Sequence, residues 1–165
     1  MPRRPMTVSE FVDIAVDPAT VYAHVSDPTQ TARWSPENTG ATVSETTASL
    51  PVGAVFTGHN KRFGVKWSTR CRVSVAEPER RFQFVVEAIG VRTPRLRGHI
   101  ATWTYDLVRI DGGTRVIETW DDDRKRWPDP LAAVFDRIVT RSSFPDHNRR
   151  NIRTTLDNLR AELER

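Results

Sequence analysis

The chain has 165 residues and a mass of 18.8 kDa, which is the usual size of one domain. Hydrophobic residues make up 38% of it, enough for a core, but no stretch approaches the about 18 consecutive apolar residues that a membrane span needs. We therefore expect one domain over residues 1–165, with a flexible stretch at 1–7 and no membrane span. The twin arginine at residues 3 and 4 is not followed by the apolar segment of an export signal, so we expect a cytoplasmic protein.

The charge balance is basic, since 25 lysines and arginines outnumber 21 aspartates and glutamates. Binding to nucleic acid requires positive charge that is clustered on one surface. Here the arginines are scattered along the chain with acids between them, as in residues 121–126, where three aspartates precede three basic residues. We therefore expect a mixed-charge surface and no nucleic-acid partner. The sequence leaves the oligomeric state open.

Three Asp-Pro pairs, at residues 17–18, 27–28 and 129–130, predict the starts of helices. An aspartate side chain accepts hydrogen bonds from the free N–H groups at a helix start, and proline suits the first helical position. The first two pairs predict one helix over 18–25 and a short one over 28–33.

Two apolar stripes at helical spacing lie near the C-terminal end. The first consists of Leu131, Val134, Phe135, Ile138 and Val139. The second follows Ser143, a candidate helix cap, and consists of Ile152, Leu156, Leu159 and Leu163. The second stripe is one-sided, which predicts a long helix packed on a sheet. The spacing leaves open whether residues 129–163 form one kinked helix or two.

The other segments up to residue 122 alternate between apolar and polar side chains, as strands do. The expected strands are Glu10–Val16, Ala41–Glu45, Ala54–Phe63, Val65–Ala76, Arg81–Ile89, Gly98–Ile110 and Thr114–Asp122. Short links with glycine or proline, such as Asp111-Gly112-Gly113, join consecutive strands and indicate antiparallel pairing. The predicted class is α+β, with a curved antiparallel sheet against a C-terminal helix around an apolar pocket.

This order of elements resembles the helix-grip fold of START-like and birch-pollen-allergen-like proteins. Its motifs are most similar to the polyketide cyclase/dehydrase branch of the SRPBCC superfamily. They are found at Asp17–Tyr22, Arg33–Glu37, Gly53–Asn60, Lys66–Val73, Glu77–Phe82, Thr102–Leu107, Gly113–Val116 and Thr155–Leu159. The resemblance implies seven strands gripping a long C-terminal helix around a hollow interior. It leaves the function open, because the superfamily includes cyclases, lipid carriers and hormone receptors.

Strand alternation assigns side chains to the two faces of the sheet. It turns Trp67, Cys71, Phe84, Trp103, Tyr105, Glu118 and Trp120 toward the interior. For Ala54–Phe63 the alternation is less clean, and resemblance to the family pattern Gly-x-x-Phe-x-Gly-x-Asn favours Phe56 and Asn60 inward. Trp34 follows the short helix and is expected to line an opening. These ten residues are the predicted ligand-binding set, although the five tryptophans could equally fill a solid core.

An apolar, aromatic interior with few polar groups is typical of a small-molecule pocket. The leading hypothesis is therefore binding or transport of a lipid, a polyketide-like aromatic or a quinone. One alternative is a cyclase or dehydratase that uses Glu118 or Tyr105 for proton transfer. A carboxyl group in an apolar cavity has a raised pKa, which suits that chemistry; an arginine partner or a solvent position would remove the effect. A second alternative is a partner-binding module with a filled core.

Other chemistry has little support in the sequence. The four histidines show no metal-ligand spacing, and neighbouring residues of Asp121-Asp122-Asp123 would alternate between the faces of a strand, so no metal is expected. No glycine-rich phosphate loop is present, and no cofactor is expected. Cys71, the single cysteine, is more typical of a small buried hydrophobic residue than of a nucleophile.

Overall fold

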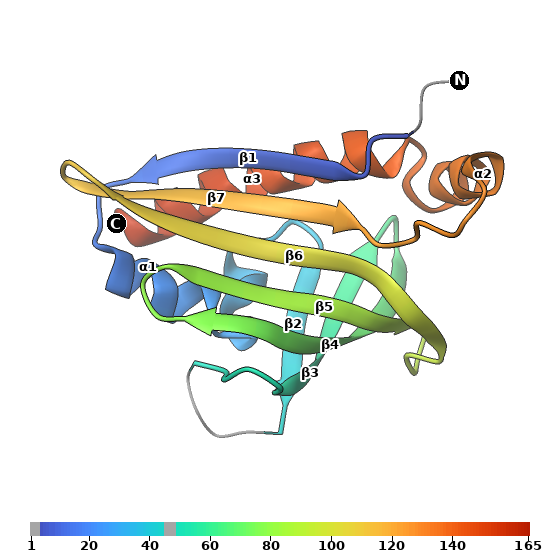
Figure 1. The fold of residues 1–165 in the computed structure, drawn as a ribbon, viewed down its shortest axis with the longest axis horizontal. Helices are drawn as coiled ribbons and strands as arrows, with labels where there is room; N and C mark the ends of the chain where they lie inside the picture. Colours follow the sequence, from blue (N-terminus) through green and yellow to red (C-terminus); the bar gives the residue numbers. More distant parts are fainter. Residues whose placement is uncertain (1–3, 45–48) are drawn as a thin grey trace.

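The computed structural model of the chain describes residues 4–44 and 49–165 (Figure 1). In chain order its elements are β1 (Thr7–Ile14), α1 (Pro18–Val25), the 3₁₀ helix η1 (Pro28–Arg33), β2 (Asn38–Val43), β3 (Val55–Arg62), β4 (Val65–Glu77), β5 (Arg81–Gly90), β6 (Leu96–Ile110), β7 (Gly113–Asp122), α2 (Asp129–Thr140) and α3 (Phe144–Leu163). Of the strand predicted to run from Ala41 to Glu45, the last residue lies outside the described residues.

Within the described residues, all seven strands form one antiparallel sheet in the order β1-β7-β6-β5-β4-β3-β2. The sheet curves, and the long helix α3 lies along β1 and β7 on one of its faces (Figure 1). The predicted α+β helix-grip architecture is therefore confirmed. The strand ends moved by up to three residues: β1 begins at Thr7 and ends at Ile14, and β2 begins at Asn38.

Two of the three Asp-Pro pairs act as helix caps, as predicted. The Asp17 carboxylate accepts from the backbone N–H of Thr20 at 2.9 Å, and that of Asp27 accepts from Thr29 at 3.1 Å. The third pair differs, because Asp129 is itself the first residue of α2 and its carboxylate accepts from the Arg4 guanidinium at 2.7 Å.

Residues 129–163 form two helices, which answers the question that the spacing left open. α2 ends at Thr140, and the next residue, Arg141, has a left-handed backbone with φ of 59°. Ser143 then caps α3 as expected, since its hydroxyl accepts from the backbone N–H of Asp146 at 3.3 Å. The predicted stripe of α3 is buried at Ile152, Leu156 and Leu159.

The apolar stripe predicted over residues 131–139 is helical, but only Phe135 and Val139 of it face the interior. Leu131, Val134 and Ile138 are 56%, 58% and 76% exposed. α2 lies beyond the end of the sheet and not on its face (Figure 1), and the side that it buries carries Ala132, Asp136 and Thr140. The helix is oriented by Asp136, which accepts from the buried Arg124 guanidinium at 2.9 Å.

Candidate functional site

The strand register brings the predicted inward residues into rows on the concave face of the sheet. Directly paired residues of antiparallel strands point to the same face. From β1 to β5, one row consists of Glu10, Glu118, Tyr105 and Phe82, and the next consists of Val8, Trp120, Trp103 and Phe84. Residues far apart in the sequence thus form one continuous, largely aromatic surface. Its two carboxyl groups, Glu10 and Glu118, are neighbours in the first of these rows.

Strands β3 and β4 continue this surface. Phe56 lies opposite Cys71, Gly58 opposite Thr69, and Asn60 opposite Trp67. Gly58 leaves room here, because a Cβ atom on it would lie 2.9 Å from the Thr69 hydroxyl. The inward orientation inferred for Phe56 and Asn60 from the family pattern is therefore the observed one.

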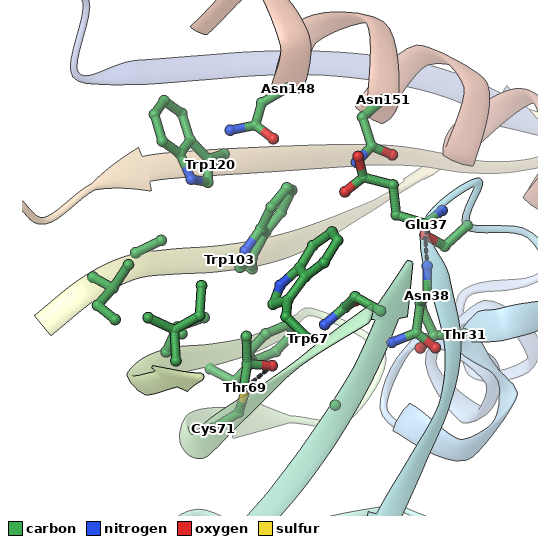
Figure 2. A pocket seen from close by; sticks show the side chains of 18 of the residues that line it. Thr31, Glu37, Asn38, Trp67, Thr69, Cys71, Trp103, Trp120, Asn148 and Asn151 are labelled. Atoms are coloured by element: carbon green, nitrogen blue, oxygen red, sulfur yellow. Dashed lines mark hydrogen bonds between the residues drawn. The ribbon is translucent and has the colours of Figure 1, made fainter. Parts of the chain in front are cut away.

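A cavity of about 230 Å³ lies between the concave face and the helices. Figure 2 shows Trp67, Trp103 and Trp120 along the sheet side, with Asn148 and Asn151 of α3 opposite them. Phe56 and Phe84 meet edge to face within the wall, with ring centroids 5.2 Å apart. The interior of the described chain is hollow, so the filled core of the second alternative is not what the structure shows.

Nine of the ten predicted ligand-binding residues line this cavity: Phe56, Asn60, Trp67, Cys71, Phe84, Trp103, Tyr105, Glu118 and Trp120. The exception is Trp34, which was expected at an opening. It is 1% exposed, and its ring lies 6.1 Å from that of His24. The Asn158 side chain donates to its backbone carbonyl at 2.9 Å, which fastens the segment after η1 to α3. Trp34 is a core residue because its own side chain is buried beside α1 and α3, although Pro28 and Thr31 of η1 line the cavity.

Glu118 is the one deeply buried carboxyl group on the cavity wall without a cationic partner among the described residues. The Tyr105 hydroxyl donates to its Oε1 atom at 3.1 Å (the two residues are cross-strand neighbours). Its Oε2 atom is buried and has no hydrogen-bond partner in the part of the chain that the structure describes. The arginine partner considered above is therefore not observed; Arg149 and Arg153 instead approach Glu10, at 3.5 and 3.1 Å.

Burial sets the protonation of this pair. Removal from water raises the pKa of Glu118 to about 8, although the Tyr105 hydrogen bond acts to lower it. Burial also raises the pKa of Tyr105 well above its usual value, and the neighbouring Glu118 raises it further. At neutral pH the pair is therefore a neutral carboxylic acid beside a neutral phenol, buried in an apolar cavity.

Cys71 has the character predicted for it. Its side chain is 2% exposed, and burial raises the pKa of its thiol to about 12. The thiol donates to the Thr69 hydroxyl at 3.5 Å. A nucleophilic cysteine needs a thiolate, so Cys71 serves here as part of the wall.

A second polar group lies on the cavity wall near α3 and was not found from the sequence. The Glu37 carboxylate accepts from Arg62 at 2.5 and 2.9 Å, and the His147 ring nitrogen Nε2 lies 2.6 Å from it. Burial raises the pKa of Glu37, but the bonds from His147 and Arg62 outweigh it and leave that pKa below its usual value. Glu37 is the last residue of the family motif at Arg33–Glu37. Residues 62 and 147 are far from it in the sequence, so no local pattern predicts that the three residues meet.

A buried ion cluster forms the wall next to α2. The Arg124 guanidinium donates to Asp122 at 2.8 Å and to Asp136 at 2.9 Å, and it lies 4.7 Å from the centre of the Phe144 ring. Burial raises the pKa of Asp122, but the Arg124 bonds lower it more. Asp121 and Asp123 instead accept from Thr7 and Thr102. The three neighbouring aspartates thus have three different partners.

None of the helices in residues 4–44 and 49–165 is long and apolar enough to cross a membrane.

Comparison with known proteins assigns the chain to a family. Residues 5–164 match the family of polyketide cyclase/dehydrase and lipid transport proteins. The chain belongs to this family. No curated protein matches it.

Solved structures of similar proteins share the fold over the whole length. A START superfamily protein from Mycobacterium smegmatis is 14% identical, with a TM-score of 0.69 and coverage of 97% of this chain and 98% of that one. A polyketide-cyclase-like protein from Corynebacterium glutamicum is 28% identical, with a TM-score of 0.58 and coverage of 100% and 92%. A protein from Chromobacterium violaceum is 18% identical, with a TM-score of 0.66 and coverage of 98% and 99%.

Proposed function

We propose that this protein binds and carries a small hydrophobic ligand in the cavity between its sheet and α3. The observation that carries this proposal is the hollow, aromatic interior of about 230 Å³. Protein interiors are close-packed, so an unfilled apolar cavity of this volume lowers stability, and a ligand that occupies it restores the lost contacts. Membership of a family that includes lipid transport proteins supports the same function. A cytoplasmic location remains a prediction from the sequence.

The cavity size favours a compact ligand. An apolar cavity of about 150 Å³ accommodates benzene. By proportion, the present cavity of about 230 Å³ suits a molecule of one or two rings, about ten non-hydrogen atoms. Among the ligand classes that the sequence suggested, this size favours a polyketide-like aromatic or a quinone over a two-chain lipid.

The first experiment is native mass spectrometry of the purified protein, with extraction of the denatured protein in parallel. The expected result is a bound apolar molecule that is released on denaturation. A panel of bicyclic aromatics, followed by tryptophan fluorescence, tests protein that is purified empty. An empty protein whose fluorescence responds to no member of the panel would refute the proposal.

A matched pair of variants tests where the ligand binds. Ala101 lines the cavity and is 6% exposed, so Ala101→Phe is expected to fill the space and abolish binding. Val108 is on the same strand but 48% exposed, and Val108→Phe is the control that adds the same ring outside the cavity. Equal binding by both variants would place the ligand elsewhere.

A second candidate function is proton transfer in the same cavity, and one observation favours it. Glu118 presents a carboxyl oxygen without a partner among the described residues, as a general acid or base must do. The test is exchange of the hydrogens next to the carbonyl of 1-tetralone in D₂O, followed by NMR. The ionised form of Glu118 would take the proton and leave the electron pair in an enolate, and the same carboxyl group, after exchange with D₂O, would return a deuteron to that carbon. Exchange that Glu118→Gln abolishes would support an enzyme; exchange that is no faster than in buffer would exclude this activity.

A further inference from the structure

The cavity wall carries an unpaired hydrogen-bonding atom. Glu118 is 3% exposed, and its Oε2 atom has no partner among residues 4–44 and 49–165. A buried polar atom without a hydrogen bond costs about 1–3 kcal/mol. The charged residues Glu37, Arg62 and Arg124 of the cavity wall are already paired, so this unpaired atom is a position where a ligand supplies the missing bond.

The neighbours of Glu118 determine what kind of group it can bind. No cation lies within ion-pair distance of it in the described chain, and the nearest arginines of α3 approach Glu10 instead. A buried carboxyl group without a counter-ion is more stable as the neutral acid. Tyr105 donates to Oε1, so the acid proton resides on Oε2. Glu118 therefore offers a donor to the cavity.

We propose that Glu118, held by Tyr105, is the binding site for a carbonyl oxygen of the ligand, and that the ligand is a compact mono- or bicyclic ketone or quinone. This inference rests on the proposed function and adds the chemical class of the ligand. The aromatic residues of the adjacent row, Trp103 and Trp120, pack against the ring system while Oε2–H donates to the carbonyl. A hydrocarbon of the same shape fills the same space but leaves Oε2 unpaired.

The test compares 1-tetralone with tetralin, which share a bicyclic skeleton and differ by one carbonyl oxygen. Binding is measured by calorimetry on the wild-type protein and on Glu118→Leu and Glu118→Gln. The wild type is expected to bind the ketone about fivefold more tightly than the hydrocarbon, the effect of one hydrogen bond. Glu118→Leu is expected to lose this preference or reverse it, because the ketone oxygen is then buried without a donor. Glu118→Gln is expected to keep the preference, because an amide can accept from Tyr105 and donate to the ligand.

A control and a measurement without any variant complete the test. Glu87→Leu replaces a carboxylate that pairs with Arg72 at 2.7 Å, outside the residues that line the cavity, and is expected to keep the preference. If Glu118→Leu does not fold, the ¹³C resonance of carbonyl-labelled 1-tetralone bound to the wild type shows whether the ligand carbonyl accepts a hydrogen bond. It is expected downfield of its position in hexane, where no donor is present.

The outcomes separate the two proposals. Equal affinity of the wild type for both probes, or a ketone preference that survives in Glu118→Leu, would overturn the inference and leave the proposed function standing. A bound carbonyl resonance at its position in hexane would do the same. Failure of the wild type to bind either probe would refute the proposed function for ligands of this size, and the inference with it.

Discussion

Glu118 makes the stability of the protein depend on pH in a direction opposite to that of most carboxylates. Its folded-state pKa is raised from 4.5 to about 8, first by burial. Between these two values the unfolded chain has released the proton and the folded chain still holds it, so the free energy of unfolding falls as the pH rises. The stability is complete below pH 4.5, and the loss is complete above pH 8. At 1.36 kcal/mol per pH unit the full loss is about 5 kcal/mol.

The substitution Glu118→Gln removes this dependence. The glutamine keeps the shape and the Tyr105 hydrogen bond, and any cost of its unpaired amide is the same at every pH. The stability of the variant minus that of the wild type is therefore expected to rise by about 4 kcal/mol between pH 5 and pH 9. Chemical denaturation followed by circular dichroism measures both proteins at each pH.

Other charges near Glu118 define the control. Glu10 is its cross-strand neighbour, and Arg149 and Arg153 of α3 pair with Glu10; all three are present in both proteins and cancel in the difference. Glu87→Gln removes a carboxylate that is 30% exposed and is expected to give a nearly flat difference. A difference for Glu118→Gln that changes by less than about 1 kcal/mol over the same range would refute the burial of a neutral acid.

Three further predictions concern the frame of the cavity. Arg124→Met leaves the buried carboxylates of Asp122 and Asp136 without their shared cation and is expected to lower the free energy of unfolding by about 3–5 kcal/mol, measured by urea denaturation; a loss below about 1 kcal/mol would show that the cluster is open to water. Trp34→Ala is expected to cost about 3–5 kcal/mol while leaving the affinity for tetralin unchanged, since Trp34 is core and not wall; calorimetry that showed a large fall in affinity would contradict its placement. Asp17→Ala removes the cap of α1 and is expected to lower the thermal midpoint through a loss of about 1 kcal/mol, whereas an unchanged midpoint would mean that the Thr20 bond contributes nothing.

The sequence was sufficient for the architecture because the fold rests on local signals that agree with one another. Alternation in β4, β6 and β7 fixes which face each side chain occupies, and the Asp-Pro pairs at residues 17 and 27 start the two short helices where predicted. The same alternation was sufficient to place Glu118 and Tyr105 inside the barrel-like curve of the sheet, because a strand offers only two directions for a side chain.

Two features depend on tertiary context and could not be predicted from local pattern. The spacing predicted the apolar stripe of α2 but not its burial: Asp136 of this helix binds the buried Arg124, and Ile138 is left exposed. Trp34 was expected at an opening from its place after a short helix, yet the packing of η1 beneath α3 buries it. Periodicity predicts that a helix has an apolar side, but it does not predict which element packs against that side.

The polar group of Glu37, Arg62 and His147 could not be predicted from the sequence for a different reason. Its members come from the segment before β2, from β3 and from α3, and only the packing of α3 over the sheet brings them within hydrogen-bond distance. The local pattern of a single chain does not indicate a polar contact between segments so far apart in the sequence.

The central claim, that the cavity binds a small hydrophobic ligand, is tested most directly by the indole N–H resonances of the five tryptophans during a titration with tetralin. Trp67, Trp103, Trp120 and Trp127 line the cavity, and Trp34 does not. The predicted result is that these four resonances shift together and saturate at one ligand per chain while that of Trp34 stays in place. Resonances that do not move, or that move equally for all five tryptophans without saturation, would contradict a ligand inside the cavity.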